Sequence, residues 1–185
     1  MAGGIKAWHG LVAEGEPESG IPYFTTAASP EELIALAWLL EEGSRKFYSS
    51  VSSLLGDSKR GKIFLDLTAA EEHHKETLLH LYTALSGKEP DGRFPRSFLG
   101  AETDEDVMEG GMRIRDALRW IEGKDPERML EISMSIETNS YDLYLKMHQR
   151  MQDEKAKEVF FRLAQEEKQH LAKLTASIEE MLRAA

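Results

Sequence analysis

Apolar residues recur at the spacing of an α-helix through four long segments of the chain. In the first segment the apolar positions are Leu33, Leu36, Ala37, Leu40, Phe47, Val51 and Leu54. Intervals of three, four and seven residues place such side chains on one face of a helix. The preceding Ser29-Pro30-Glu31-Glu32 has the features of a helix start: a serine N-cap, a proline at the first helical position and a glutamate three residues after the cap. Gly56-Asp57 is predicted to end this helix.

Three further helices follow from the same periodicity and from their caps. They are predicted at about Ser58 to Ser86, Asp125 to Met151 and Asp153 to Leu182. Gly87 fits the C-terminal cap of the second helix, and Asp125-Pro126-Glu127 opens the third. Each long helix has roughly 26 to 28 residues, which corresponds to about 40 Å.

The segment between the second and third helices is long and differs in composition. It contains Pro90, Gly92, Pro95 and Gly100, followed by an acidic run from Glu102 to Asp106. We expect this run to be a solvated loop, followed by a short helix from about Val107 to Ile121. Two helical hairpins joined by a long crossover are the connectivity of a ferritin-like four-helix bundle. The sequence therefore predicts an all-α fold of this kind over residues 29–185, with residues 1–28 as a linker or tail.

Composition excludes several classes of function. The 185 residues carry a formal net charge of −10, which argues against nucleic acid and anionic membrane surfaces as partners. The sequence contains no cysteine, so disulfides, thiolate catalysis and iron–sulfur clusters are excluded. The longest apolar run, Leu33 to Leu40, is too short to span a bilayer, and Met1 to Gly10 lacks the apolar core of a secretory signal. We therefore expect a cytoplasmic protein.

The two hairpins repeat one another without gaps at an offset of 96 residues (137 − 41 for a Glu pair, 170 − 74 for a His pair). Other matched pairs are Pro30 and Pro126, Tyr48 and Tyr144, Phe64 and Phe160, and Leu78 and Leu174. Such self-similarity indicates a duplicated structural unit. It predicts a bundle with approximate two-fold symmetry.

Glutamate and histidine also recur in both copies, on the faces that carry core residues. The candidate metal ligands, which are also the candidate catalytic residues, are Glu41, Glu71, His74, Glu137, Glu167 and His170. Glu71 and His74 are three residues apart, so both side chains lie on one face of their helix and can bind the same ion. An unpaired ionised carboxylate in a core costs several kcal/mol, so four of them imply a counter-charge. One Glu from each of two helices and Glu-x-x-His from each of the other two is the pattern of di-iron and di-manganese carboxylate proteins.

Charge and ligand type favour two divalent ions. Four carboxylates balance two divalent cations, and two neutral imidazoles complete a mixed oxygen and nitrogen environment that suits iron or manganese. His73, His80 and His148 have no partner in the repeat, and we interpret them as surface residues. Tyr48 and Tyr144 lie on the ligand faces, two turns beyond the first Glu of each hairpin. Core packing and a hydrogen bond to a ligand carboxylate explain these tyrosines about equally well.

At these residues the chain resembles a known family. Glu41…Phe47-Tyr48 and Leu67-Thr-Ala-Ala-Glu71-Glu-His-His74, with their second copies, are similar to the ferritin-like domain of rubrerythrins over about residues 29 to 182. The resemblance implies a non-haem di-iron centre held by the six candidate ligands, often in a homodimer, that reduces hydrogen peroxide or reacts with dioxygen. Typical rubrerythrins have a further Glu where this chain has Ser140, and a cysteine-ligated electron-transfer domain. Since this chain has neither, the activity would require an external electron-donor protein.

Other interpretations stay open. One is iron binding for storage or sensing without efficient turnover, and another is a di-manganese catalase-like protein that disproportionates peroxide without a reductant. A purely structural bundle is the weakest, because it leaves four core-facing carboxylates without counter-charge. The segment Gly3 to Gly10 is similar to the end of rhodanese domains, which implies that residues 1–28 are the remnant of a rhodanese fusion.

Overall fold

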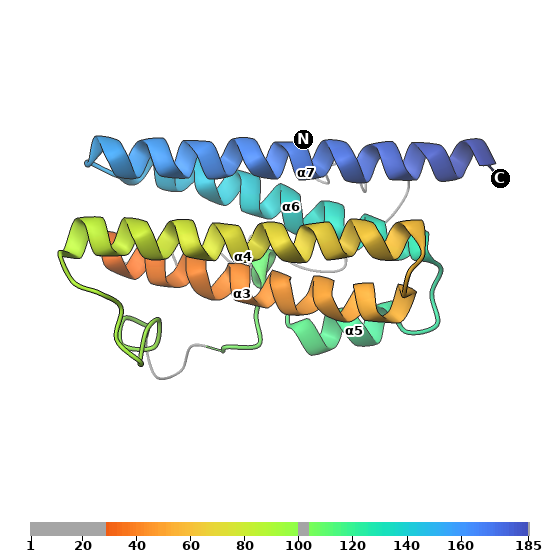
Figure 1. The fold of residues 1–185 in the computed structure, drawn as a ribbon, viewed down its shortest axis with the longest axis horizontal. Coiled ribbons are helices and arrows are strands. Elements are labelled where there is room, and N and C mark those ends of the chain that lie inside the picture. Colours follow the sequence, from red (N-terminus) through yellow and green to blue (C-terminus); the bar gives the residue numbers. More distant parts are fainter. Residues whose placement is uncertain (1–28, 100–103, 185) are drawn as a thin grey trace.

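The computed structural model describes residues 29–99 and 104–184, which form a bundle of four long helices (Figure 1). Their bounds are Pro30–Leu55 (α3), Lys59–Ser86 (α4), Pro126–Arg150 (α6) and Glu154–Ala184 (α7). Helix α3 packs along α4, and α6 packs along α7, so the chain forms two hairpins that face each other. The described ranges contain no β-strand and no helix long and apolar enough to cross a membrane. The predicted all-α, ferritin-like four-helix bundle is confirmed, whereas the predictions for residues 1–28 lie outside the described residues.

Local side-chain chemistry explains where the helices begin and end. Ser29 caps α3: its Oγ accepts a hydrogen bond from the backbone N–H of Glu32 at 3.2 Å, and the Glu32 carboxylate accepts one from the Ser29 N–H at 3.1 Å. Gly87 ends α4 with a left-handed φ of 67°, which glycine adopts without steric cost. The Asp153 carboxylate caps α7 by accepting a hydrogen bond from the Ala156 N–H at 2.9 Å. These caps lie where the sequence predicts them.

The crossover between the hairpins is only partly helical. The prediction of a helix from about Val107 to Ile121 is wrong in its first half, because helix α5 covers only Ile114–Ile121. A short 3-10 turn, Glu109–Gly111 (η1), precedes α5, and Val107 pairs with Arg113 in an isolated antiparallel bridge across this turn. Gly110 and Gly111 have positive φ values of 80° and 71°. Backbone in this conformation cannot continue an α-helix, so the helix starts only after the two glycines.

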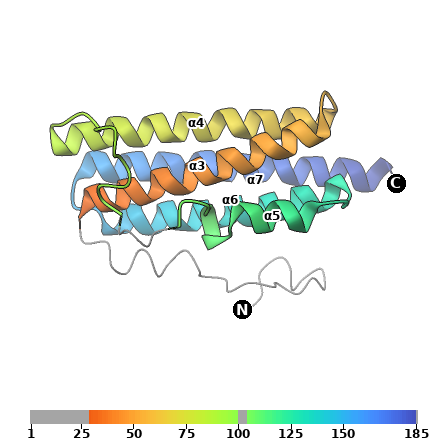
Figure 2. The same ribbon diagram turned by 90° about the horizontal axis from the view of Figure 1, so that it is seen from below.

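The crossover lies against one side of the bundle. A Cβ at Gly43 of α3 would overlap the carbonyl oxygen of Val107 and lie 2.9 Å from the Cα of Met108. Glycine is therefore required at position 43 for this close approach. Met108 is fully buried, η1 also contacts α6, and α5 lies beside α3 and α6 (Figure 2). The crossover thus packs against the bundle and contributes buried residues to the core.

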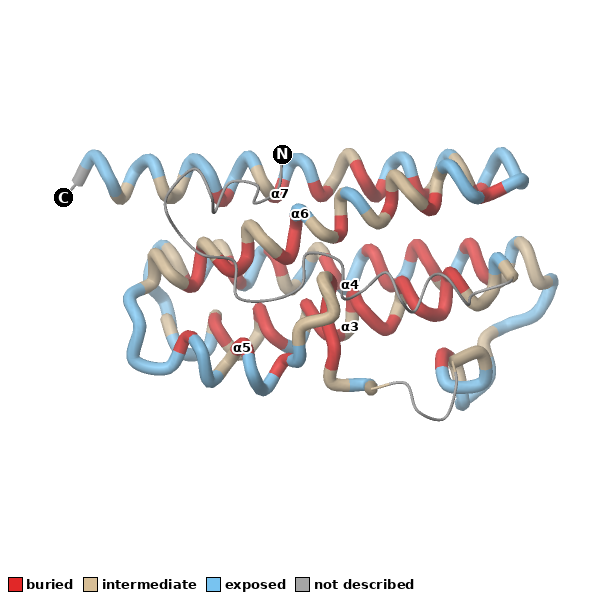
Figure 3. The backbone as a smooth tube through the Cα atoms, turned by 180° about the vertical axis from the view of Figure 1, so that it is seen from behind, coloured by how far each residue is buried: buried red, intermediate tan, exposed pale blue. Residues whose placement is uncertain are grey.

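Two apolar clusters fill the bundle, and a polar layer separates them. Representative members are Leu40, Leu78, Tyr144 and Leu163 in one cluster, and Phe47, Leu67, Ile136 and Leu174 in the other. On every long helix a buried glutamate lies between residues of the two clusters, and on α4 and α7 a buried histidine accompanies it. Figure 3 shows buried positions recurring along the long helices, which is the pattern expected for helices that surround a shared core.

Candidate metal centre

All six predicted site residues lie together in the polar layer. Their side chains come one or two from each long helix, and each is at most 5% exposed: Glu41, Glu71, His74, Glu137, Glu167 and His170. Apolar residues lie before and after these positions on the same face of each helix, and that face points into the core. The fold therefore places four carboxylates and two imidazoles inside an otherwise apolar core.

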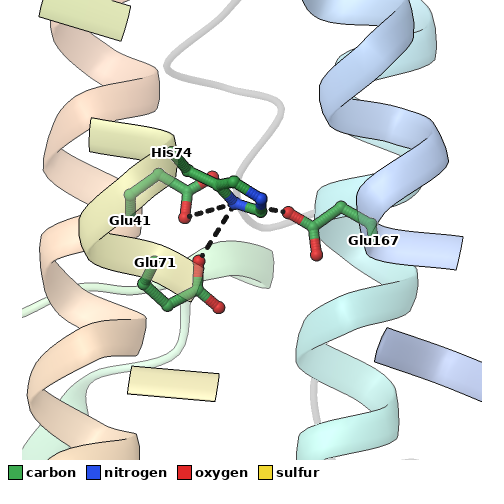
Figure 4. A group of neighbouring side chains, drawn as sticks. All are labelled: Glu41, Glu71, His74 and Glu167. Carbon is green, nitrogen blue, oxygen red and sulfur yellow. Dashed lines mark ion pairs between the residues drawn. The ribbon is translucent and has the colours of Figure 1, made fainter. Parts of the chain in front are cut away.

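His74 lies at the centre of the first group of side chains. Its Nδ1 is 3.4 Å from an Oε of Glu41, 3.3 Å from one of Glu71 and 3.1 Å from one of Glu167. Figure 4 shows the imidazole between the carboxylates of α3 and α4 on one side and Glu167 of α7 on the other. One ligand atom from each of these four residues lies within 4.8 Å of the others, so together they could hold a metal ion.

His170 lies at the centre of a second group. Its Nδ1 is 3.0 Å from Glu137 Oε2 and 3.2 Å from Glu167 Oε2. Glu71, Glu137 and His170 could hold a second ion. Glu71 thus belongs to both groups, and Glu167 contacts both histidines through different oxygens. The two imidazole rings are stacked with their centroids 5.6 Å apart, so the two groups are adjacent and share carboxylates.

Burial and mutual repulsion disfavour ionisation of two of the carboxylates. Burial raises the pKa of Glu41 well above its ordinary value, and the charge of Glu71 raises it further. The pKa of Glu137 is raised in the same way, by burial and then by the charge of Glu167. Without positive charge, the layer cannot keep all of its carboxylates ionised.

The histidines supply such charge. Burial lowers the pKa of a histidine, but hydrogen bonding to Glu137 and Glu167 overcomes this and raises the pKa of His170 to about 10. The charges of Glu41 and Glu167 likewise overcome burial and raise the pKa of His74 well above its ordinary value. Burial would raise the pKa of Glu167, yet the charge of His74 and hydrogen bonding to His170 hold it well below the ordinary value. In the metal-free protein, the protonated imidazoles of His74 and His170 therefore provide the positive charge that the surrounding carboxylates require.

Three polar atoms of the site make no hydrogen bond and are available to bind a cation. Glu41 Oε2, His74 Nδ1 and Glu167 Oε1 are buried without a hydrogen-bond partner, because their close neighbours are not in hydrogen-bond geometry. A buried polar atom left in this state costs about 1–3 kcal/mol. Carboxylate oxygens and imidazole nitrogens are donors for iron, manganese and zinc. The donor set therefore fits a metal pair.

Two tyrosines donate hydrogen bonds across the interface between the hairpins to the carboxylates of Glu41 and Glu137. The Tyr48 hydroxyl on α3 donates to Glu137 Oε1 on α6 at 2.5 Å, and the Tyr144 hydroxyl on α6 donates to Glu41 Oε1 on α3. Both tyrosines are fully buried. They thus take part in core packing and in hydrogen bonding, the two roles that the sequence left open.

A further carboxylate orients one of the histidines. His74 Nε2 lies 3.2 Å from Glu166 Oε2, which leaves Nδ1 facing the site. Such an outer carboxylate fixes the tautomer and ring position of a metal-binding histidine. The position equivalent to Glu166 in the first copy of the repeat is Ala70, so His170 lacks this support and the two halves of the site differ.

The other histidines in the described part of the chain lie away from the polar layer. His73 and His80 are exposed, as predicted. His148 is partly buried, with Nδ1 2.9 Å from the carbonyl oxygen of Lys157, so its interpretation as a surface residue is only partly correct.

Sequence reasoning missed Glu109, a fifth buried carboxylate. It lies in η1 of the crossover, is 2% exposed and accepts a hydrogen bond from the Ser44 hydroxyl. Burial raises its pKa well above the ordinary value, and the charge of Glu71 raises it further. The crossover has no second copy in the repeat, so the signal that identifies the other site residues is absent at Glu109. The pair Gly110-Gly111 directly after Glu109 is the sequence signal that could have indicated a turn here in place of the predicted helix.

Comparison with known proteins agrees with this geometry. The rubrerythrin family model matches residues 32–178, a range that leaves the predicted rhodanese-like segment outside the match. Among solved structures, the chain is similar to the hypothetical protein Pfu-1136390-001 from Pyrococcus furiosus, with 25% identity, a TM-score of 0.60, and coverage of 84% of this chain and 91% of that chain. No curated protein gives a significant match. With four helices that place Glu and Glu-x-x-His in one buried layer, and with a family match over most of its length, the chain belongs to the rubrerythrin family.

Proposed function

We propose that the chain is a non-haem di-iron oxidoreductase of rubrerythrin type. It would reduce hydrogen peroxide, or react with dioxygen, with electrons from an external donor protein. The observation that supports this proposal most is a pair of adjacent ligand groups in a buried layer, which have Glu71 in common and are linked by Glu167 through its contacts with both histidines. A homodimer, carried over from the family resemblance, and the cytoplasmic location expected from the sequence are part of the same proposal.

The residues divide into shared and terminal ligands. Glu71 and Glu167 would bridge two ions, since each contributes to both halves of the site. Glu41 with His74, and Glu137 with His170, would complete one ion each. Two iron ions held in this way would supply two electrons together to the cleavage of an O–O bond.

The chain itself positions and protects this reaction. Burial, followed by the charge of Glu137, raises the pKa of the Tyr48 hydroxyl well above its ordinary value. Tyr48 therefore stays protonated and keeps donating to Glu137, which fixes that carboxylate. The apolar clusters on both sides exclude bulk water, which strengthens the electrostatic interactions in the layer. Glu166 holds the His74 ring with Nδ1 inward.

Metal content per chain tests the proposal directly. We expect about two irons per chain after anaerobic loading with ferrous iron, and loss of at least one in the Glu71→Ala and His170→Ala variants. His80→Ala, which removes an exposed histidine from the same helix as Glu71, is the matched control and should keep both ions. An iron content that does not differ between the site variants and the control would contradict the assignment of the site.

Activity then separates the candidate functions. Rapid oxidation of the ferrous protein by peroxide, with repeated turnover when an artificial reductant is present, would support the oxidoreductase. The sequence has Ser140 at the position of an extra family glutamate and contains no cysteine, which favours iron binding for storage or sensing as the second candidate. Slow, stoichiometric oxidation would support that alternative. Oxygen release from peroxide without a reductant, with manganese bound, would instead indicate catalase-like chemistry.

A further inference from the structure

We propose that Glu109 is an additional carboxylate ligand of the metal centre, supplied by the crossover and used when the bound pair carries trivalent charge. The proposal rests on the proposed function only in assuming that the polar layer binds metal. It does not depend on which oxidant the protein uses.

The surroundings of Glu109 contain carboxylates rather than cations. The side chain is 2% exposed, its Oε1 is buried without a hydrogen-bond partner, and Ser44 donates to Oε2. Within the described part of the chain, no ion pair with a lysine, arginine or histidine is formed by Glu109. The strongest charge interactions of Glu109 with other side chains are with Glu71, Glu167 and Glu137. A buried carboxylate among carboxylates is costly without counter-charge, and the metal pair is the counter-charge that these neighbours share.

The position of Glu109 is fixed by the backbone around it. Gly43 lets the Val107 carbonyl and Met108 press against α3. The Met108 N–H donates to the Met112 carbonyl at 3.0 Å and closes the turn that carries Glu109. Ser44, the partner of Glu109, lies three residues after Glu41 and therefore about one turn further along the same face of α3. The crossover thus presents its carboxylate beside the ligand layer.

Charge arithmetic indicates when this ligand is needed. Glu41, Glu71, Glu137 and Glu167 carry four negative charges, which already balance two divalent ions. Oxidation of both ions adds two positive charges to a site buried in an apolar core, where unbalanced charge is expensive. A fifth carboxylate offsets one of them. Glu109 is therefore expected to favour the trivalent over the divalent pair.

Binding of redox-inert probe metals tests this preference apart from turnover. The full-length wild type and Glu109→Gln would be titrated anaerobically with Mn²⁺, and separately with Ga³⁺ supplied as its nitrilotriacetate complex. We expect Glu109→Gln to weaken Ga³⁺ binding by tenfold or more and to change Mn²⁺ binding by less than about threefold, because glutamine keeps the size of the side chain but not its charge. Asp106→Asn removes the same charge from a half-buried position of the crossover and is the matched control. It should change neither affinity.

Each contrary result has a distinct meaning. Equal Ga³⁺ affinity in wild type and Glu109→Gln, or an equal loss in Asp106→Asn, would overturn the role of Glu109 while leaving the metal site intact. Wild type that binds neither probe would overturn the metal site itself and, with it, the proposed function. If Glu109→Gln does not fold, a crystal structure of wild type with Ga³⁺ decides the matter. Glu109 bound to an ion would support the proposal, and Glu109 still held only by Ser44 would refute it.

Discussion

Tyr48 and Tyr144 show how single residues connect the halves of the site. Each tyrosine belongs to one hairpin and donates a hydrogen bond to a glutamate of the other, so the two bonds run in opposite directions across the bundle. They leave one oxygen of each glutamate free of the phenol. These bonds hold the carboxylates of Glu41 and Glu137 in place before a metal ion binds, which lowers the entropy cost of ordering the ligands on binding.

Replacing Tyr144 with phenylalanine should therefore weaken metal binding without removing a ligand. The variant keeps the ring packed on Phe160, at a centroid distance of 6.0 Å, but deletes the hydrogen bond to Glu41. We expect a tenfold to hundredfold lower affinity for Mn²⁺, the range typical for loss of a partner that orients a ligand. Competition with a chromophoric chelator would measure it.

Tyr82→Phe is the control for this change. Tyr82 is also a buried tyrosine, but it lies near the C-terminal end of α4, where it packs on Phe94. Its Mn²⁺ affinity should match wild type. Equal affinities in Tyr144→Phe and wild type would mean that Glu41 is positioned by its helix alone.

Residue types in the repeat single out the six polar side chains that the structure brings together in the buried layer, but not the nearby Glu109. Glu41, His74 and their partners stand out because a carboxylate or imidazole that recurs on an apolar face needs a physical reason. Glu109 carried no such signal, since its burial arises from docking of the crossover. Docking of this kind depends on contacts between residues far apart in sequence, such as Val107 with Gly43.

At the scale of elements, the crossover is the part whose structure depends most on tertiary contact. Helix caps and apolar periodicity predict the four long helices well, because both are local in sequence. The short helix of the crossover was predicted to start too early, because Gly110 and Gly111 adopt positive φ values and no α-helix continues through them. The crossover matters for function because it carries Glu109 to the ligand layer.

Gly43→Ala should detach the crossover from α3. The added Cβ would overlap the Val107 carbonyl and lie 2.9 Å from the Met108 Cα, so the backbone that leads into η1 would have to move away from α3. We expect a loss of about 1–3 kcal/mol in unfolding free energy, the usual range for overpacking a core, measured by urea denaturation. In Gly92→Ala the new Cβ meets nothing within 4 Å, so this control should keep wild-type stability. Similar stability of both variants would show that the crossover is only loosely held.

At the scale of the whole molecule, the polar layer is the candidate metal centre and interrupts the apolar packing of the core. The two hairpins meet there through charged groups, while apolar clusters pack on either side. Symmetry between the hairpins is broken by Glu166 beside His74 and by Glu109 beside Ser44. Glu166 contacts His74, and Glu109 contacts α3, the helix that carries Glu41, so the two halves of the candidate metal centre differ.

The stability of the metal-free protein should fall as the pH rises from 7 toward 10. The folded-state pKa of His170 is raised from 6.5 to about 10, so the stabilisation by its charge is complete below pH 6.5 and is lost as the pH approaches 10. Glu41 and Glu137, whose pKa values are also raised, oppose folding once the pH exceeds their ordinary range. Glu167, with a lowered pKa, adds stability above its ordinary value and loses it only in acid, so it does not reverse the trend.

Bound metal should remove this dependence, because it replaces the imidazolium charge and binds the deprotonated ligands. Thermal unfolding at pH 6, 7, 8 and 9, with and without Mn²⁺, would measure the effect. We expect the metal-free Tm to drop by at least about 2–4 °C, equivalent to about 1 kcal/mol for a chain of this size, while the stabilisation by Mn²⁺ grows with pH. His170→Gln should flatten the metal-free profile, whereas the exposed His80→Gln should leave it unchanged. A metal-free Tm that rises with pH would contradict the charge balance described for the polar layer, in which imidazolium ions take the place of the metal.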